Sequence, residues 1–97
     1  MSETEVSYVE NSAKYYVRVC TLFDLNGKMI PQYLLWEDGQ KYTIDRVLDV
    51  KPAPARKAGG YGDRYTVRIR GQERYLFFEH SLAADAAAPG KWFVEKP

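Results

Sequence analysis

The chain has 97 residues, a formal net charge of +1, one cysteine, one histidine and 14% aromatic residues. This length allows a single domain, which buries about 60–65% of the surface of the unfolded chain. A lone cysteine excludes an internal disulfide, and no stretch has the roughly 20 apolar residues that span a membrane. The first residues lack the basic and apolar regions of a secretion signal, so we expect a cytoplasmic protein.

The small net charge conceals an uneven distribution along the chain. Residues 1–13 carry three glutamates and no basic residue, and we expect them to form a disordered or loosely docked tail before a single domain at residues 14–97. Residues 41–74 hold nine basic and four acidic side chains, among them six of the seven arginines. The middle of the sequence is therefore locally basic, which can steer a phosphate backbone.

The first half of the domain alternates as β-strands do. Residues 14–24 are rich in β-forming side chains at period 2, and Asn26-Gly27 predicts a type I′ hairpin turn. The returning segment, residues 28–36, contains Pro31, which is typical of an edge or of the start of a strand. Asp38-Gly39 repeats the turn chemistry before residues 40–50. There the alternation slips at residues 45–48, as a bulge or sharp bend would cause.

The second half continues the pattern after an irregular stretch at residues 51–63. Residues 64–70 form the clearest strand, and Gly71-Gln72 is expected to turn the chain into residues 73–79. That segment is apolar on both faces, so we expect it to be central or covered on both sides. Residues 80–90 can hold one or two helical turns that end at Pro89-Gly90, and residues 91–95 form the last strand.

These elements predict an all-β protein. We expect a small, partly open SH3-like β-barrel of five to six short antiparallel strands, because closure hides the edges of a small sheet. A two-sheet sandwich is the alternative.

Catalytic and metal-binding chemistry find little support in the sequence. Cys20 and His80 are sixty residues apart with no evident third group, and His80 near Ser81 and Asp85 resembles a triad in composition only. One cysteine and one histidine cannot form a structural zinc site. The glycine run at residues 59–62 lacks the helix and the Lys-Ser/Thr of phosphate-binding loops. We therefore expect no enzyme, no cofactor and no small-molecule substrate.

Nucleic-acid binding is better supported. Three arginines alternate along residues 64–70, which places side chains about 7 Å apart on one strand face, close to the phosphate spacing of a nucleic-acid strand. Basic residues interleaved with aromatic ones are typical of grooves that bind single strands. The candidate residues are Lys51, Arg56, Lys57, Tyr61, Arg64, Arg68, Arg70 and Arg74. The alternative is that these arginines form cross-strand ion pairs with Glu73, Glu79 and Asp45.

The aromatic residues indicate a second kind of surface. Fourteen aromatic rings are more than a barrel of this size readily hides, and adjacent pairs such as Phe77-Phe78 must place one ring on each face of the sheet. We expect some of these rings to be exposed, or covered by another part of the chain or by a second subunit. The candidate partner-binding residues are Tyr16, Tyr33, Phe78 and Phe93.

Several blocks of residues also indicate a family. These are Lys14-Tyr15-Tyr16-Val17-Arg18-Val19, Phe23-Asp24-x-x-Gly27-x-x-Ile30-Pro31, Trp36-Glu37-Asp38-Gly39 with the following "RVLDV" segment, and Lys91-Trp92-Phe93-Val94-Glu95. Across residues 14–95 the chain resembles a small uncharacterised family from Gram-positive bacteria, which implies a stand-alone bacterial domain. Its layout is also similar to short proteins encoded beside Y-family translesion DNA polymerases, which implies a DNA-repair context. Neither resemblance carries over a catalytic or binding residue.

Together these observations predict a non-enzymatic small β-barrel that binds nucleic acid through an arginine-rich strand face. The alternative is a protein-interaction or homodimerisation adaptor that uses an exposed aromatic patch or a sheet edge. No membrane partner is expected.

Overall fold

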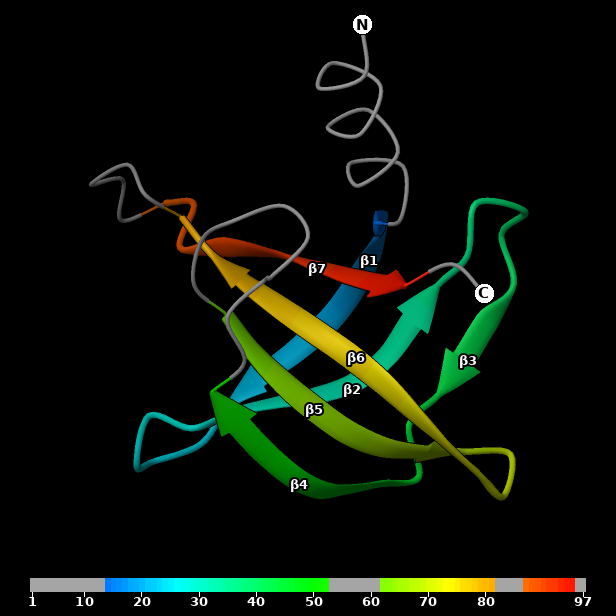
Figure 1. The fold of residues 1–97 in the computed structure, drawn as a ribbon, viewed down its shortest axis with the longest axis horizontal. Coiled ribbons are helices and arrows are strands. Elements are labelled where there is room, and N and C mark those ends of the chain that lie inside the picture. Colours follow the sequence, from blue (N-terminus) through cyan, green and yellow to red (C-terminus); the bar gives the residue numbers. More distant parts are fainter. Residues whose placement is uncertain (1–13, 53–61, 82–86, 96–97) are drawn as a thin grey trace, which may run out of the picture.

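The computed structural model describes residues 14–52, 62–81 and 87–95 (Figure 1). In these residues the chain forms antiparallel strands and no helix, which confirms the all-β class. The seven strands are β1 (Lys14–Phe23), β2 (Met29–Leu35), β3 (Lys41–Thr43), β4 (Arg46–Pro52), β5 (Gly62–Ile69), β6 (Gln72–His80) and β7 (Gly90–Glu95). No helix in the described part of the chain has the length and apolar character of a membrane span.

The strand count differs from the expected five to six because the segment at residues 40–50 is two strands. The chain bends at Ile44 and Asp45, where the alternation slips in the sequence, and the β4–β5 pairing shifts register between Val47 and Asp49. The predicted tail at residues 1–13 lies outside the described residues. The helical turns expected at residues 80–90 fall mainly on residues 82–86, which also lie outside them.

The strands form one curled sheet in the order β3-β2-β1-β7-β6-β5-β4 (Figure 1). Its two end strands, β3 and β4, follow each other directly along the chain. The link between them is attached on both sides, because the Ile44 N–H donates to the Gln32 carbonyl at 2.9 Å and the Asp45 N–H to the Arg68 carbonyl at 2.8 Å. The sheet is therefore a half-barrel whose ends meet at this link.

The first two hairpins differ from the predicted turn type. A type I′ turn needs two residues with positive φ, but Gly27 and Gly39 are the only residues of their loops with positive φ. Each loop instead closes with a glycine N–H bond to a carbonyl three residues earlier, from Gly27 to Asp24 and from Gly39 to Trp36, both at 2.9 Å. This is the three-residue loop in which a turn is followed by a left-handed glycine.

The two-residue turn with two positive φ values lies in the β5–β6 hairpin. Arg70 has φ +52° and Gly71 has φ +78°, so the turn is centred one residue earlier than the expected Gly71-Gln72. Arg70 is the only non-glycine residue with positive φ in the described chain. Left-handed backbone costs an L-residue about 1–2 kcal/mol, so this arginine is held in a strained conformation.

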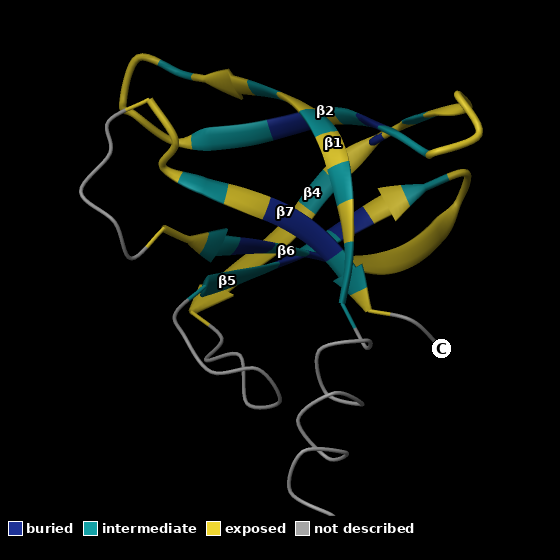
Figure 2. Ribbon diagram, turned by 90° about the horizontal axis from the view of Figure 1, so that it is seen from above, coloured by how far each residue is buried: buried dark blue, intermediate teal, exposed yellow. Residues whose placement is uncertain are grey.

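The core lies inside the curl. Figure 2 shows buried segments on β2 and β7, and the most buried side chains come from the middle of the sheet: Tyr65, Val67, Leu76, Phe78 and Trp92. Adjacent aromatic residues point to opposite faces as expected, because Phe78 contacts Trp92 inside while Phe77 stacks on Phe93 outside. β6 is central, as predicted, since it pairs with both β5 and β7.

Two glycines allow β6 to be approached closely from both sides. Gly62 of β5 and Gly90 of β7 lie opposite Glu79 and His80. A Cβ added at Gly90 would lie 2.3 Å from the Glu79 carbonyl oxygen, and one added at Gly62 would lie 2.5 Å from the Phe78 carbonyl oxygen. Neither site has room for a side chain.

Candidate nucleic-acid interface

A row of side chains crosses the convex outer face of five strands. The pairing places Lys51 opposite Arg64, Arg64 opposite Phe77, Phe77 opposite Phe93, and Phe93 opposite Tyr16. We call these five residues the outer row. Residues directly opposite each other on one face of an antiparallel sheet interact, so the row brings two cations and three aromatic rings together from β4, β5, β6, β7 and β1.

The aromatic part of the outer row is packed. The Phe77 and Phe93 rings stack with centroids 5.0 Å apart and planes 7° apart, and Tyr16 meets Phe93 edge-on at 5.9 Å. Tyr75, two residues before Phe77 on the same face of β6, contacts Phe77 at 6.4 Å. Phe93 is 5% exposed, whereas Tyr16 and Tyr75 are 48% and 52% exposed. The exposed rings of Tyr16 and Tyr75 thus pack against the less exposed rings of Phe93 and Phe77.

Cations lie on these rings. The Arg64 guanidinium is 4.7 Å from the centre of the Tyr75 ring, and the Lys91 ammonium is 5.3 Å from that of Tyr16. Such contacts hold a cation over a ring with about 0.5–1 kcal/mol at exposed sites. The buried Nε of Arg64 has no hydrogen-bond partner among the described residues. A buried donor without a partner is rare in folded proteins.

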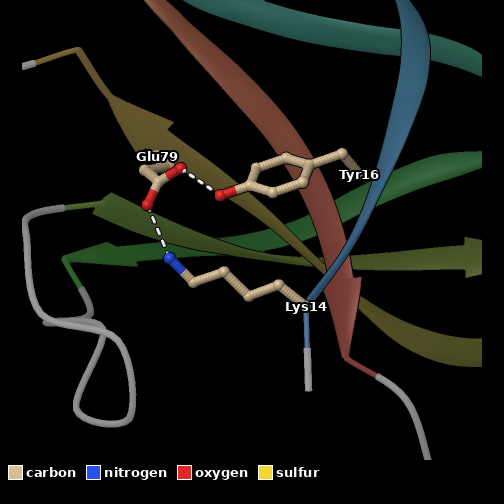
Figure 3. A network of polar contacts seen from close by, with 3 residues as sticks. All are labelled: Lys14, Tyr16 and Glu79. Carbon is tan, nitrogen blue, oxygen red and sulfur yellow. Dashed lines mark hydrogen bonds and ion pairs between the residues drawn. The ribbon is translucent and has the colours of Figure 1, made fainter. Parts of the chain in front are cut away.

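One carboxylate on this face is already occupied. Lys14 and Tyr16, both from β1, reach over β7 to the two oxygens of Glu79 on β6 (Figure 3). Burial raises the pKa of Glu79, but the hydrogen bonds from Lys14 and Tyr16 and the charges of Lys14 and Lys91 outweigh it, so the pKa is lowered. Burial, with the hydrogen bond to Glu79 and its charge, raises the pKa of Tyr16 to about 12. Glu79 therefore stays ionised and Tyr16 neutral around pH 7.

The arginines of β5 and β6 are not neutralised by the acids proposed as their partners. Glu79 pairs with Lys14, and Glu73, although opposite Arg68 in register, forms no ion pair with it. The ion pairs among the described residues are Lys14–Glu79, Lys51–Asp49 at 3.6 Å and His80–Asp63 at 3.0 Å. The cross-strand ion pairing considered for the arginines is thus absent from residues 14–52, 62–81 and 87–95.

The predicted nucleic-acid-binding residues fall into three groups: those on the outer face, those that leave it, and those outside the described residues. Lys51, Arg64 and Arg68 lie on the outer face, and Arg46 opposite Arg68 adds to them. Arg70 does not share that face, because β5 ends at Ile69 and the left-handed turn carries Arg70 over the Tyr42 ring at 4.7 Å.

Arg74 also leaves the outer face. It lies opposite Val67, on the side of β6 that faces the core. Arg56, Lys57 and Tyr61 lie outside the described residues.

The predicted partner-binding aromatics are mostly covered. Tyr16 is exposed, and Tyr33 is half-buried with the Lys41 ammonium 4.2 Å from its ring centre. Phe78 and Phe93 are buried at 6% and 5% exposure, so neither offers a contact surface. Phe78 is covered because it faces the core, and Phe93 because the Lys14 ammonium, Phe77 and Tyr16 surround it.

Sequence reasoning assigned no binding role to Tyr75, Phe77, Lys14 or Lys91. Alternation along β6 separates Tyr75 and Phe77 from the buried Leu76 and Phe78, so their outward face can be read from the pattern. The register that brings Phe77 to Phe93 and Tyr16 cannot, because it depends on the lengths of the loops between distant strands.

The residues considered for catalysis do not form a common site in the described chain. Cys20 is exposed on β1, and His80 Nε2 lies 3.0 Å from Asp63 Oδ2. Asp85 lies outside the described residues. Within the described ranges, no three histidine, cysteine, aspartate or glutamate side chains gather as a metal site would require.

Comparison with protein-family models, with curated proteins and with solved structures found no match to this chain.

Proposed function

We propose that this protein is a non-enzymatic module that binds single-stranded nucleic acid on the outer face of its sheet. The observation that supports this is the outer row with the neighbouring Tyr75, where the exposed rings of Tyr16 and Tyr75 lie beside Arg64, an arginine that forms no ion pair in the described parts of the chain. Single-strand-binding surfaces combine these two elements, because every base has a face that can stack and every nucleotide has a phosphate.

In this proposal Tyr16 and Tyr75 stack on bases, while Arg64, Lys51 and Arg68 contact phosphates. The two tyrosines come from strands separated by β7, so they are roughly 10 Å apart across the sheet at about 4.8 Å per strand, and Tyr75 is displaced by two residues, about 7 Å, along β6.

The test is a fluorescence-anisotropy titration of the full chain with labelled single- and double-stranded oligonucleotides at 50 mM salt. We expect tighter binding to the single strand and a logarithmic salt slope of about −2, since about three phosphate contacts contribute roughly −0.7 each. Tyr75→Ala removes one stacking ring and is expected to weaken binding by about tenfold. Arg64→Gln is expected to weaken binding and to flatten the salt slope.

The matched control is Arg74→Gln, which removes the same charge from the core-facing side of the neighbouring strand. It should change the oligonucleotide affinity by no more than about twofold, which is the effect expected from the loss of one distant, screened charge. No binding at tens of micromolar protein, or equal losses in Arg64→Gln and Arg74→Gln, would refute the proposal.

We also propose a cellular role and a fold type. The resemblance to short proteins encoded beside translesion polymerases supports a role as a DNA-repair accessory in a bacterial cell. The SH3-like assignment is supported by the meandering strand order, in which strands adjacent in the chain are adjacent in the curl.

A second candidate function is self-association or docking of a protein partner at the β1–β2 hairpin. Leu22, Phe23 and Leu25 are 51%, 61% and 106% exposed there, which is a concentration of large apolar side chains at one tip. Light scattering coupled to size exclusion tests this. A dimer that dissociates in Phe23→Ser supports it, and a monomer at every concentration removes the homodimer form.

A further inference from the structure

The inner side of β6 changes character along the strand. Leu76 and Phe78 face the core and are buried, and the same face continues at Gln72 and Arg74. β7 pairs only with residues 77–80 of β6, so residues 72–75 extend past it. Two polar side chains thus occupy core-facing positions where the curl is open.

A cavity of about 710 Å³ occupies this open end. Leu34, Val67 and Leu76 are among the apolar residues that line it, and Trp36 and Tyr42 contribute aromatic rings from the opposite side of the curl. Sites for small molecules have volumes of about 300–1,000 Å³ and mostly apolar walls with a few polar groups. This cavity has both properties.

Two guanidinium groups line the cavity as well. Arg70 lies over the Tyr42 ring at 4.7 Å, and the Nη2 of Arg74 donates a 2.6 Å hydrogen bond to the Gln72 side chain. Neither arginine forms an ion pair with a carboxylate in the described parts of the chain, although Glu95 also lines the cavity. Their charge is therefore available to an anion.

The backbone conformation of Arg70 also indicates a binding site. The first position of such a turn favours glycine, asparagine or aspartate, which adopt positive φ at little cost. Here it is an arginine with φ +52°, and this conformation carries the side chain back over Tyr42. Strained residues of this kind gather at functional sites, where the placement of the side chain outweighs the strain.

We propose that this cavity binds a small molecule with a flat apolar body and one anionic group. The body lies against Trp36, Tyr42 and the apolar floor, and Arg70 and Arg74 bind the anion. The cavity borders the outer row, because Tyr75 and Phe77 also line it. Its anion site is built from Arg70 and Arg74 and does not rest on the nucleic-acid proposal.

The probe is 8-anilinonaphthalene-1-sulfonate, an aromatic anion that fluoresces in apolar surroundings, compared with N-phenyl-1-naphthylamine, which has the same rings without the sulfonate. We expect the wild-type chain to bind the anionic dye about tenfold more tightly, because charge-assisted hydrogen bonds favour it. Arg70→Asn and Arg74→Gln should each remove most of that preference and leave the affinity for the neutral dye unchanged. Trp36→Leu should weaken the binding of both dyes.

Arg68→Gln is the matched control, since it removes an arginine from the outer face of the adjacent strand. It should leave both dye affinities unchanged while weakening oligonucleotide binding. Equal affinity for the two dyes in the wild-type chain, or an equal loss of the anionic dye in Arg68→Gln and Arg74→Gln, would overturn the cavity site. The oligonucleotide titration is a separate measurement, so either proposal can fail while the other stands.

Discussion

The two ends of β6 behave differently although they belong to one strand. Residues 77–80 lie between β5 and β7, carry the Lys14–Glu79–Tyr16 network outside and Phe78 inside, and approach two glycines closely. Residues 72–75 have β5 on one side only and carry arginine, glutamine and an exposed tyrosine. The comparison indicates that the part of β6 with a neighbouring strand on both sides stabilises the sheet. The part with only one neighbouring strand carries polar side chains that are available to bind a ligand.

The largest expected effect is at the paired end. Gly90→Ala places a Cβ 2.3 Å from the Glu79 carbonyl oxygen and 2.6 Å from the Phe78 ring, so β7 must shift. We expect a loss of about 2–3 kcal/mol in the free energy of unfolding, measured by urea denaturation. Gly39→Ala is the control, because its φ is +88° but open space surrounds it. It should cost only about 1 kcal/mol, and equal losses in the two variants would contradict the close packing at Gly90.

A smaller effect is expected from the network on the outer face. The lowered pKa of Glu79 means that its contribution to stability is present above the unfolded-state pKa and is lost as the pH falls through the folded-state pKa. Glu79→Gln should therefore be less stable than the wild-type chain by about 1 kcal/mol at pH 7. The difference should persist down to about pH 4, the ordinary range of a glutamate pKa. It should disappear as the pH falls further, through the lowered pKa of Glu79.

Asp49→Asn provides the comparison for that experiment. Asp49 pairs with Lys51 at 3.6 Å, and both side chains are at least half exposed. Its stability should stay close to that of the wild-type chain at every pH. A pH-independent difference between Glu79→Gln and the wild-type chain would show that the network stabilises through packing and not through charge.

The smallest effect is expected at the open end, and its sign is reversed. Arg70→Asn creates an Asn-Gly turn, which favours the positive φ values of this hairpin. The gain is offset in part by the lost contact with Tyr42, so we expect the free energy of unfolding to rise by less than about 1 kcal/mol. A stable variant that no longer prefers the anionic dye would separate stability from binding at this residue. A clear loss of stability would mean that Arg70 supports the hairpin.

Alternation at period 2 predicted most of the strands, because most of them have one face that is more buried than the other. It did not separate β3 from β4, and β4 has a single half-buried residue. The slip in the alternation nevertheless located the bend after Thr43. The loop types could not be read from Asn26-Gly27, since Asp24 Oδ1 accepts hydrogen bonds from the Asn26 and Lys28 N–H groups and favours a longer loop. A dipeptide does not report such side-chain contacts.

For the candidate site, alternation placed Arg64 and Arg68 on one face but extended the strand one residue too far. Arg70 left that face because the turn begins there. The outer row itself depends on the register between strands, including the shift between Val47 and Asp49. Register of this kind follows from bulges and loop lengths acting together, and the identity of single residues does not determine it.

The pairing of β1 with β7 places Lys14 opposite Glu95, so the first and last strands run side by side. Strands that follow each other in the chain also pair from β1 to β3 and from β4 to β7, and the link between β3 and β4 joins the two ends of the sheet. A circularly permuted chain, with a short linker from β7 to β1 and a cut in the loop at residues 37–39, would keep all these contacts in register. In that chain the four residue pairs between β1 and β7 would become a local hairpin, while the three pairs between β2 and β3 would become distant in sequence. The contact order would therefore fall slightly, and a lower contact order favours faster folding.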